Sequence, residues 1–286
     1  MPTVTPSGAG VPLGARIAGI DLAAPVSRGD FALILRTLAA HGVVCFPDQH
    51  LDAAAQAAFS RRFGTLEVHV SGAFQVPEHP DVMVLSNIVE NGRPIGLADA
   101  GQDWHTDMSF SRTIAFVNVL HALEVPRRDG RVLGDTLFAD MAAAFDDLPP
   151  ALRVRLETLT ATHDFAKFWD MMRARGGAGS VRKPLTEAQR ARKPPVSQPI
   201  VLRHPLSGRR ILYANPGYTV RIDGLSEAEG GALLEALFAH QLQTRYQYAH
   251  RWAEGDVLMW DNIRTMHYAV PDYGPSEHRL MRRCQA

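Results

Sequence analysis

The fold prediction for this 286-residue chain depends on the stretch Trp104-His105-Thr106-Asp107, taken with Trp260-Asp261-Asn262 and His267 further along. Two histidines and one carboxylate, with no cysteine, are the ligand types of a facial triad that holds non-haem Fe(II) on one face and leaves the other face open. Phe110 and Phe116 follow the first stretch, and a site inside a β-barrel requires such apolar flanks. The sequence therefore predicts an iron site enclosed by short strands.

His-x-Asp pairs also arise by chance, and the chain has three of them. With 12 His and 19 Asp in 286 residues, about 0.8 such pairs are expected. Asp52 precedes an alanine-rich run and is predicted to cap a helix. His79-Pro80-Asp81 is predicted to form a turn because a proline separates its two polar residues. His105 and Asp107 would share one face of a strand, so this pair is the candidate for metal ligands.

The C-terminal part carries a second signal. A turn at Gly255-Asp256 leads into an apolar strand, and a later strand contains Arg279-Leu280-Met281-Arg282-Arg283. Strand alternation places Arg279, Met281 and Arg283 on one face and Arg282 on the other. Two inward arginines are costly to bury unpaired, so they imply an anionic partner, and arginine grips a carboxylate in a bidentate manner. An iron site beside such an arginine is what a 2-oxoglutarate-dependent oxygenase needs.

The chain resembles the taurine dioxygenase (TauD/TfdA) family of Fe(II)/2-oxoglutarate-dependent dioxygenases, and the resemblance runs over nearly its whole length. Each matching segment is weak alone, but together they occur in the family's order. The segments are Gly42-Val43-Val44-Cys45-Phe46-Pro47, Phe59-Ser60-Arg61-Arg62-Phe63-Gly64, Trp104-His105-Thr106-Asp107, Gly134-Asp135-Thr136-Leu137-Phe138, Leu212-Tyr213-Ala214-Asn215, Trp260-Asp261-Asn262, His267 and Arg279-Leu280-Met281-Arg282-Arg283.

The resemblance implies a role for each matching residue. Fe(II), 2-oxoglutarate and O2 are the implied cofactor and co-substrates. The implied iron ligands are His105, Asp107 and His267; the implied 2-oxoglutarate residues are Thr136 and Arg279; the implied substrate residues are His69, Arg283, Phe165 and Met108.

Two departures bear on the substrate. Taurine-specific relatives carry a tyrosine shortly after the position of His69, where this chain has Val70-Ser71-Gly72-Ala73. They also carry an asparagine four residues before the first iron ligand, where this chain has Gly101. Both changes remove contacts to the polar ends of taurine. The expected substrate is another small anionic compound, such as a sulfonate, an alkyl sulfate or a phenoxy acid, which the enzyme hydroxylates while 2-oxoglutarate is converted to succinate and CO2.

Composition favours a cytoplasmic enzyme with a small-molecule substrate. The formal net charge is zero, from 30 basic and 30 acidic residues, so neither nucleic acid nor a membrane surface is an expected partner. The sequence has no run of 18 apolar residues and no basic and apolar N-terminal signal segment. Its two cysteines, Cys45 and Cys284, are expected to be free thiols. Relatives are dimers or tetramers, so a homo-oligomer is expected.

The chain is predicted to form one catalytic domain over residues 1–286, with a mixed α/β, mainly β fold. Many short strands with scattered helices suit a double-stranded β-helix, the cupin-like jelly roll, with flanking helices. The stretch from Arg173 to Pro195 is rich in Gly, Arg, Lys and Pro, which is typical of a mobile loop. Relatives have a lid here, so a lid loop is predicted around 165–197. Helices are expected at 30–40, 52–63, 150–159 and 226–243, and strands at 43–46, 82–88, 115–123, 134–139, 198–203 and 210–222.

Other functions remain open at this stage. Within the oxygenases, a biosynthetic hydroxylase or desaturase acting on an amino-acid-like or secondary-metabolite substrate is the main alternative. A zinc hydrolase or isomerase could use the same three ligands, although Thr136 and Arg279 argue against it. The last alternative is a binding protein without catalytic activity.

Overall fold

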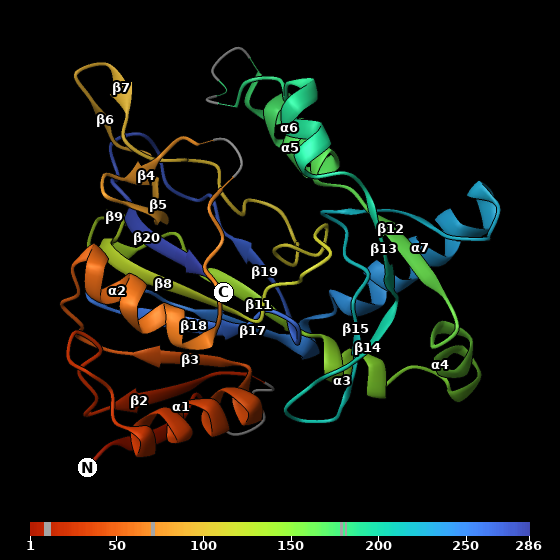
Figure 1. Ribbon diagram of the computed structural model, residues 1–286, viewed down its shortest axis with the longest axis horizontal. Helices are drawn as coiled ribbons and strands as arrows, with labels where there is room; N and C mark the ends of the chain where they lie inside the picture. Colours follow the sequence, from red (N-terminus) through yellow and green to blue (C-terminus); the bar gives the residue numbers. More distant parts are fainter. Residues whose placement is uncertain (9–12, 70–71, 178–179, 181) are drawn as a thin grey trace.

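The computed structural model describes residues 1–8, 13–69, 72–177, 180 and 182–286. Within this part of the chain the fold is mixed α/β, and its largest unit is an eight-stranded sheet (Figure 1). The largest sheet has eight strands in the order β1-β2-β3-β18-β8-β20-β5-β4, and its neighbours run antiparallel except β2 and β3. Its strands are β1 (Thr3–Pro6), β2 (Ala15–Ala18), β3 (Val43–Phe46), β4 (Gln75–Val76), β5 (His79–Ser86), β8 (Val117–Glu124), β18 (Val257–Asp261) and β20 (Leu280–Gln285).

A second sheet has the order β17-β11-β19, formed by β17 (Gln247–His250), β11 (Thr136–Asp140) and β19 (Thr265–Ala269). The chain passes from the large sheet to the second between β18 and β19. The carboxylate of Asp261 holds this turn by accepting the amides of Ile263 and Arg264, each at 3.1 Å. The buried Arg264 in turn pairs with Asp140 at the end of β11, at 2.6 Å.

Both faces of the large sheet are covered, which explains why β18 is apolar from Val257 to Trp260 and buried throughout. Val257 and Met259 join a cluster that includes residues of α1 (Arg28–His41) and α2 (Ala53–Ser60). Leu258 and Trp260 point to the opposite face and join a cluster with Phe138 of β11. A central strand buried on both faces loses the polar alternation of a half-exposed strand. Helices α1 and α2 therefore cover one face of the large sheet, and the second sheet covers the other.

A further group of elements, β12 to β15 with α7 (Glu227–Gln241), lies to the right of these two sheets in Figure 1, whereas β6 and β7 lie at the upper left. A three-stranded sheet has the order β13-β12-β16, and α7 contacts β16. Short two-stranded ribbons pair β14 with β15, β9 with β10 and β6 with β7. The strands are β12 (Thr160–His163), β13 (Val196–Pro199), β14 (Val201–Arg203), β15 (Arg210–Leu212), β16 (Thr219–Ile222), β6 (Val89–Glu90), β7 (Arg93–Pro94), β9 (Arg127–Arg128) and β10 (Arg131–Val132).

The predicted N-cap at Asp52 is confirmed, and the helix expected at 30–40 begins earlier, at Arg28. Ser27, Asp52 and Ser226 accept backbone amides at the starts of α1, α2 and α7, as N-cap residues do. The helices are α1 (Arg28–His41), α2 (Ala53–Ser60) followed by the 3-10 turn Arg61–Phe63, α3 (Met141–Asp146), α4 (Pro150–Leu156), α5 (Phe165–Gly176), α6 (Glu187–Arg192), α7 (Glu227–Gln241) and the 3-10 turn Thr244–Tyr246. None of the helices in the described ranges is long and apolar enough to cross a membrane. Cys45 and Cys284 are both buried free thiols, as expected.

Two local predictions were wrong. His79-Pro80-Asp81 is not a turn but the start of β5. Pro80 lies outside the part of β5 that pairs with β20, from Met83 to Ser86, so its missing N–H costs no hydrogen bond of that ladder. The predicted loop from Arg173 to Pro195 contains the end of α5 and the whole of α6. Residues 178, 179 and 181 of that prediction lie outside the described part of the chain.

Candidate active site

The three predicted iron ligands meet at one point of the buried interior. His105 forms an isolated bridge to His267 of β19, with N–H···O distances of 3.1 and 2.9 Å in the two directions. Asp107 lies in the turn that follows, so the two ligands do not share a regular strand as the sequence predicted. Their ligand atoms nevertheless lie within 4.8 Å of one another. Nε2 of His105 is 3.4 Å from one carboxylate oxygen of Asp107, and Nε2 of His267 is 3.5 Å from the other.

The two imidazoles direct their Nε2 atoms toward this point. Nδ1 of His105 lies 2.7 Å from the carbonyl oxygen of Asp103, which fixes the tautomer that donates there and leaves Nε2 free to bind a metal. Burial, followed by the nearby His105, lowers the pKa of His267 well below its usual value. Both rings are therefore suited to act as neutral metal ligands.

Asp107 supplies the negative charge of the site. Burial alone would raise the pKa of its carboxyl group, but the guanidinium of Arg283 and the two imidazoles together lower it far below its usual range. The nearest guanidinium nitrogen of Arg283 is 3.7 Å from Asp107 Oδ2. That oxygen makes no hydrogen bond within the described residues. A buried carboxylate with an unused oxygen, facing two imidazole nitrogens, fits a divalent cation.

Thr136 and Arg279 line a pocket that adjoins the three ligands. The pocket is bounded by both residues and by His267, Arg283 and Trp260, so the two inward arginines of the sequence prediction lie on the same pocket. Arg279 is almost fully buried, and its Nε has no hydrogen-bond partner in the described chain. An uncompensated guanidinium of this kind fits a carboxylate ligand. Arg282 points away, as predicted, and donates to the carbonyl of Leu51.

Sequence reasoning missed two residues that support this site. Trp252 donates its indole N–H to the hydroxyl oxygen of Thr136 at 3.0 Å, which leaves the Thr136 hydroxyl proton free to donate into the pocket. Asn262 binds the backbone of Asp107 with its side-chain amide. Asn262 belongs to a segment that the sequence marked, but nothing local indicated its partner. Trp252 had no signal in the sequence.

A second, wider pocket opens on the other side of the ligands. His69, Phe165 and Met108, the predicted substrate residues, all line it together with His105 and Asp107. Its aromatic wall is formed by Phe110, Phe165, Phe168 and Tyr218. Arg283 borders both pockets. The structure thus brings all nine predicted site residues to one region.

Among the described residues that line this wider pocket are three cations, Arg182, Lys193 and Arg283, and two carboxylates, Glu67 and Asp107. Lys193 pairs with Glu67 at 2.6 Å, and Arg182 pairs with Asp99 at 2.8 Å. Burial, and then Arg283, Arg182 and Lys193, lower the pKa of His69 to about 3. His69 is therefore neutral at physiological pH and is placed between the rings of Phe165 and Trp169, with centroid distances of 6.3 and 6.1 Å.

Glycines keep the space around His105 open. A Cβ atom at Gly217 would lie 2.7 Å from Cβ of His105, which is closer than real contacts allow. At Gly101, where taurine-specific relatives have asparagine, a Cβ would lie 3.4 Å from Cε1 of His105, and the backbone has a positive φ of +73°. Gly101 borders both pockets, so the missing side chain widens the space over the ligands.

Comparisons with known proteins agree with this geometry. The sequence model of the taurine catabolism dioxygenase TauD, TfdA family matches residues 3–285. Pentalenolactone F synthase of Streptomyces avermitilis is 33% identical over 96% of this chain and 90% of its own length. The alpha-ketoglutarate-dependent 2,4-dichlorophenoxyacetate dioxygenase of Cupriavidus pinatubonensis is 34% identical over 94% of this chain and 92% of its own length.

The fold is also similar to that of solved structures. The crystal structure of AAD-2 in complex with Mn(II) and N-oxalylglycine superposes with a TM-score of 0.79 at 27% identity, covering 100% of this chain and 97% of the other. The match of the family sequence model spans nearly the whole chain, and the two enzymes named above are more than 30% identical to it. This protein belongs to the taurine catabolism dioxygenase TauD, TfdA family.

Proposed function

We propose that the protein is an Fe(II)- and 2-oxoglutarate-dependent dioxygenase that hydroxylates a small anionic organic substrate. The observation that carries this proposal is the meeting of His105, Asp107 and His267 beside a buried, uncompensated arginine, Arg279. The three ligands would hold the iron, and Thr136 and Arg279 would hold the distal carboxylate of 2-oxoglutarate. When bound, iron with 2-oxoglutarate and O2 supplies the oxidising power, and 2-oxoglutarate leaves as succinate and CO2.

The protein's own residues position the reactants and exclude water. The Thr136 hydroxyl would donate a hydrogen bond to the co-substrate carboxylate, because its oxygen already accepts one from Trp252. Trp260 and Phe138 pack against His267, with ring centroids at 4.8 and 6.2 Å, and shield it from solvent. A hydrolase would have no use for the Thr136–Arg279 pocket, which argues against the zinc alternative.

The wider pocket supports a substrate with an anionic group and an apolar body. Arg283 would bind the anionic group. It lies 3.7 Å from Asp107 without a hydrogen bond to that carboxylate, and its Nε makes no hydrogen bond within the described residues, whereas Arg182 and Lys193 donate to acidic partners. The aromatic rings of Phe110 and Phe165, 4.9 Å apart between centroids, would contact the body of the substrate. A phenoxy acid, a sulfonate or an alkyl sulfate has this form. The aromatic wall also suits a more apolar secondary metabolite, so a biosynthetic hydroxylase or desaturase is the second candidate.

We infer that residues 165–197 act as the lid of this pocket, since α5 contributes Phe165 and Phe168 and the following segments contribute Arg182 and Lys193. The two facing sheets, β8-β20-β5 with their neighbours and β17-β11-β19, would correspond to the double-stranded β-helix of a jelly roll. The proposal also includes one domain over residues 1–286 and a homodimer or homotetramer, which light scattering of the purified protein would test.

Succinate formation tests the proposed activity. Purified protein is incubated in air with Fe(II), ascorbate and 2-oxoglutarate, together with a panel of phenoxy acids, sulfonates, alkyl sulfates and apolar carboxylic acids. We expect one class to raise succinate above the background without substrate, and Asp107→Ala to abolish this rise. Asp52→Ala is the matched control, because Asp52 belongs to another His-x-Asp pair but only caps α2. Undiminished turnover by Asp107→Ala would refute the assignment.

A further inference from the structure

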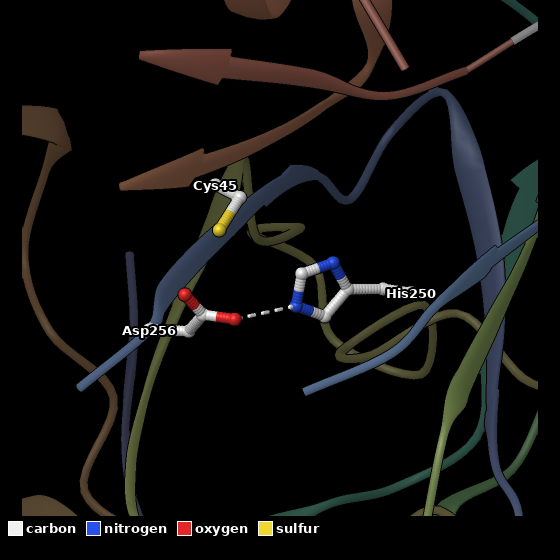
Figure 2. A group of neighbouring side chains, drawn as sticks. All are labelled: Cys45, His250 and Asp256. Atoms are coloured by element: carbon white, nitrogen blue, oxygen red, sulfur yellow. Dashed lines mark ion pairs between the residues drawn. The ribbon is translucent and has the colours of Figure 1, made fainter. Parts of the chain in front are cut away.

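A second cluster of potential metal ligands lies behind the 2-oxoglutarate pocket. Cys45 of β3, His250 of β17 and Asp256, just before β18, are all buried, and their ligand atoms lie within 4.8 Å of one another. Figure 2 shows the thiol, the imidazole and the carboxylate pointing toward one another from three separate segments. We propose that Cys45, His250 and Asp256 form a second metal site, which takes a thiophilic divalent cation such as Zn²⁺.

The donor set suits zinc. Thiolate, imidazole and carboxylate are its usual protein ligands, and three protein ligands leave a fourth position for water. The facial triad lacks a thiol, so the two sites differ in the metals they prefer. A tetrahedral zinc ion needs donor atoms somewhat closer together than the 4.8 Å limit of this cluster, which side-chain rotations can supply.

The hydrogen bonds around the cluster leave atoms unused at its centre. Nδ1 of His250 lies 3.3 Å from the hydroxyl of Tyr248, which orients the ring so that Nε2 faces Asp256 at 3.4 Å. Nε2 of His250 and Oδ1 of Asp256 are both buried, and neither makes a hydrogen bond of normal geometry within the described residues. Without a metal these two atoms have only longer contacts, since His250 Nε2 lies 3.4 Å from Asp256 and Oδ1 of Asp256 lies 3.9 Å from Arg16. A bound cation would satisfy both atoms.

One neighbouring group opposes a cation. Nη2 of Arg16 lies 3.9 Å from Oδ1 of Asp256, but its side chain is 55% exposed and can turn toward solvent. Burial, with the nearby Asp256, raises the pKa of the Cys45 thiol, so that the metal-free site holds a protonated sulfur. Zinc displaces that proton when it binds a thiol.

The site adjoins the co-substrate pocket through the β17–β11 pairing. His250 is the register partner of Thr136, and Trp252 packs edge-on against His250 at 4.7 Å while donating to the Thr136 hydroxyl. A bound cation would therefore fix β3, β17 and the start of β18 directly behind Thr136. The expected role is to stabilise this side of the pocket.

Cobalt binding tests the site independently of the iron triad. Asp107→Ala protein, freed of metal with a chelator and kept reduced, is titrated with Co²⁺ while the near-ultraviolet thiolate-to-cobalt charge-transfer absorption is recorded. We expect this band to appear, to persist when Cys284→Ser is added, and to disappear when Cys45→Ser is added instead. Cys284 is the matched control because it is the other buried free thiol.

Two further measurements cover a failure of Cys45→Ser to fold. His250→Gln keeps the thiol and should weaken Co²⁺ binding at least tenfold, whereas Arg16→Gln should strengthen it several-fold. Zn²⁺ should raise the melting temperature of the Asp107→Ala protein, and raise that of its His250→Gln derivative less at the same Zn²⁺ concentration. Absence of a charge-transfer band in Asp107→Ala, or a band that persists after Cys45→Ser, would overturn the proposal and leave a plain hydrogen-bonded cluster.

Discussion

The side-chain amide of Asn262 forms two hydrogen bonds with the backbone of Asp107. Nδ2 of Asn262 donates to the carbonyl oxygen of Asp107 at 2.8 Å, and Oδ1 accepts the amide of the same residue at 3.2 Å. The same amide also donates to the carbonyl of Ala115 and accepts from Asn118. Asp107 lies in a turn without strand partners, so Asn262 replaces the hydrogen bonds that a sheet would have supplied.

Replacing Asn262 should therefore weaken metal binding without removing a ligand. We expect Asn262→Ala to lower Fe(II) affinity about 10- to 100-fold, the usual effect of losing a group that orients a ligand. Anaerobic titration calorimetry measures the affinity. Asn262→Asp keeps the acceptor and loses the donor, so it should also bind iron more weakly. An unchanged affinity in both variants would show that the turn holds Asp107 unaided.

Thr136 and Trp252 allow a test of the co-substrate pocket. Thr136→Val removes the hydroxyl at nearly constant volume, and a hydrogen bond to a charged group contributes about 1.5–3 kcal/mol. The KM for 2-oxoglutarate should therefore rise roughly 10- to 100-fold. Trp252→Phe should raise the same KM by a smaller factor, because the hydroxyl remains but is no longer oriented. Steady-state kinetics with 2-oxoglutarate varied would decide, and equal KM values in all three proteins would contradict the assigned role of Thr136.

Gly217 offers a steric test of the same site. Its Cβ would lie 2.7 Å from Cβ of His105 and 3.2 Å from the carbonyl oxygen of Trp104. Gly217→Ala should therefore displace His105 and reduce both iron affinity and turnover. Gly231→Ala is the control, because nothing lies within 4 Å of its Cβ in α7 and the change should stabilise the helix by about 0.5–1 kcal/mol. Full turnover by Gly217→Ala would mean that the segment can shift away from His105.

His163 should make stability depend on pH. Burial, and then the ammonium group of Lys167, lower its pKa from 6.5 to about 4 in the folded state. Below about pH 6.5 the unfolded chain binds a proton at this histidine, whereas the folded protein does not. The free energy of unfolding is therefore at its full value above that pH and decreases as the pH falls toward 4. The loss is on the order of 1 kcal/mol per pH unit in this window.

Urea unfolding at pH 7 and pH 5 measures this effect. His163→Gln retains polar atoms that can bond Ser109 and Thr219, the partners of the histidine. The variant should lose less stability between the two pH values than the wild type. Equal losses would show that His163 is protonated in the folded state.

The sequence predicted the site better than it predicted the local structure around it. The alternation of Arg279, Met281 and Arg283 was enough to place two arginines on one pocket, because strand periodicity holds even across the irregular pairing between Leu280 and Met281. The loop predicted at 173–195 was wrong in part: despite its loop-like composition, the stretch contains the last turn of α5 and all of α6, which begins with a capping box of Thr186 and Gln189. Phe165, Phe168, Trp169 and Met172 recur at helical intervals and are all buried, so the signal for α5 was present.

By itself, the sequence determined the chemistry of the donors: two imidazoles and a carboxylate, inward arginines, and the capping residues that start α1, α2 and α7. These properties depend on residue type and short-range spacing. The tertiary structure, and not the local sequence, determines which of these side chains come into contact. Four features of the site join segments that lie far apart in the chain. They are the His105–His267 bridge, the hydrogen bonds of Asn262 to the backbone of Asp107, the hydrogen bond from Trp252 to Thr136, and the cluster of Cys45, His250 and Asp256. Such contacts form because buried sheets pair distant strands, and no local pattern encodes their partners.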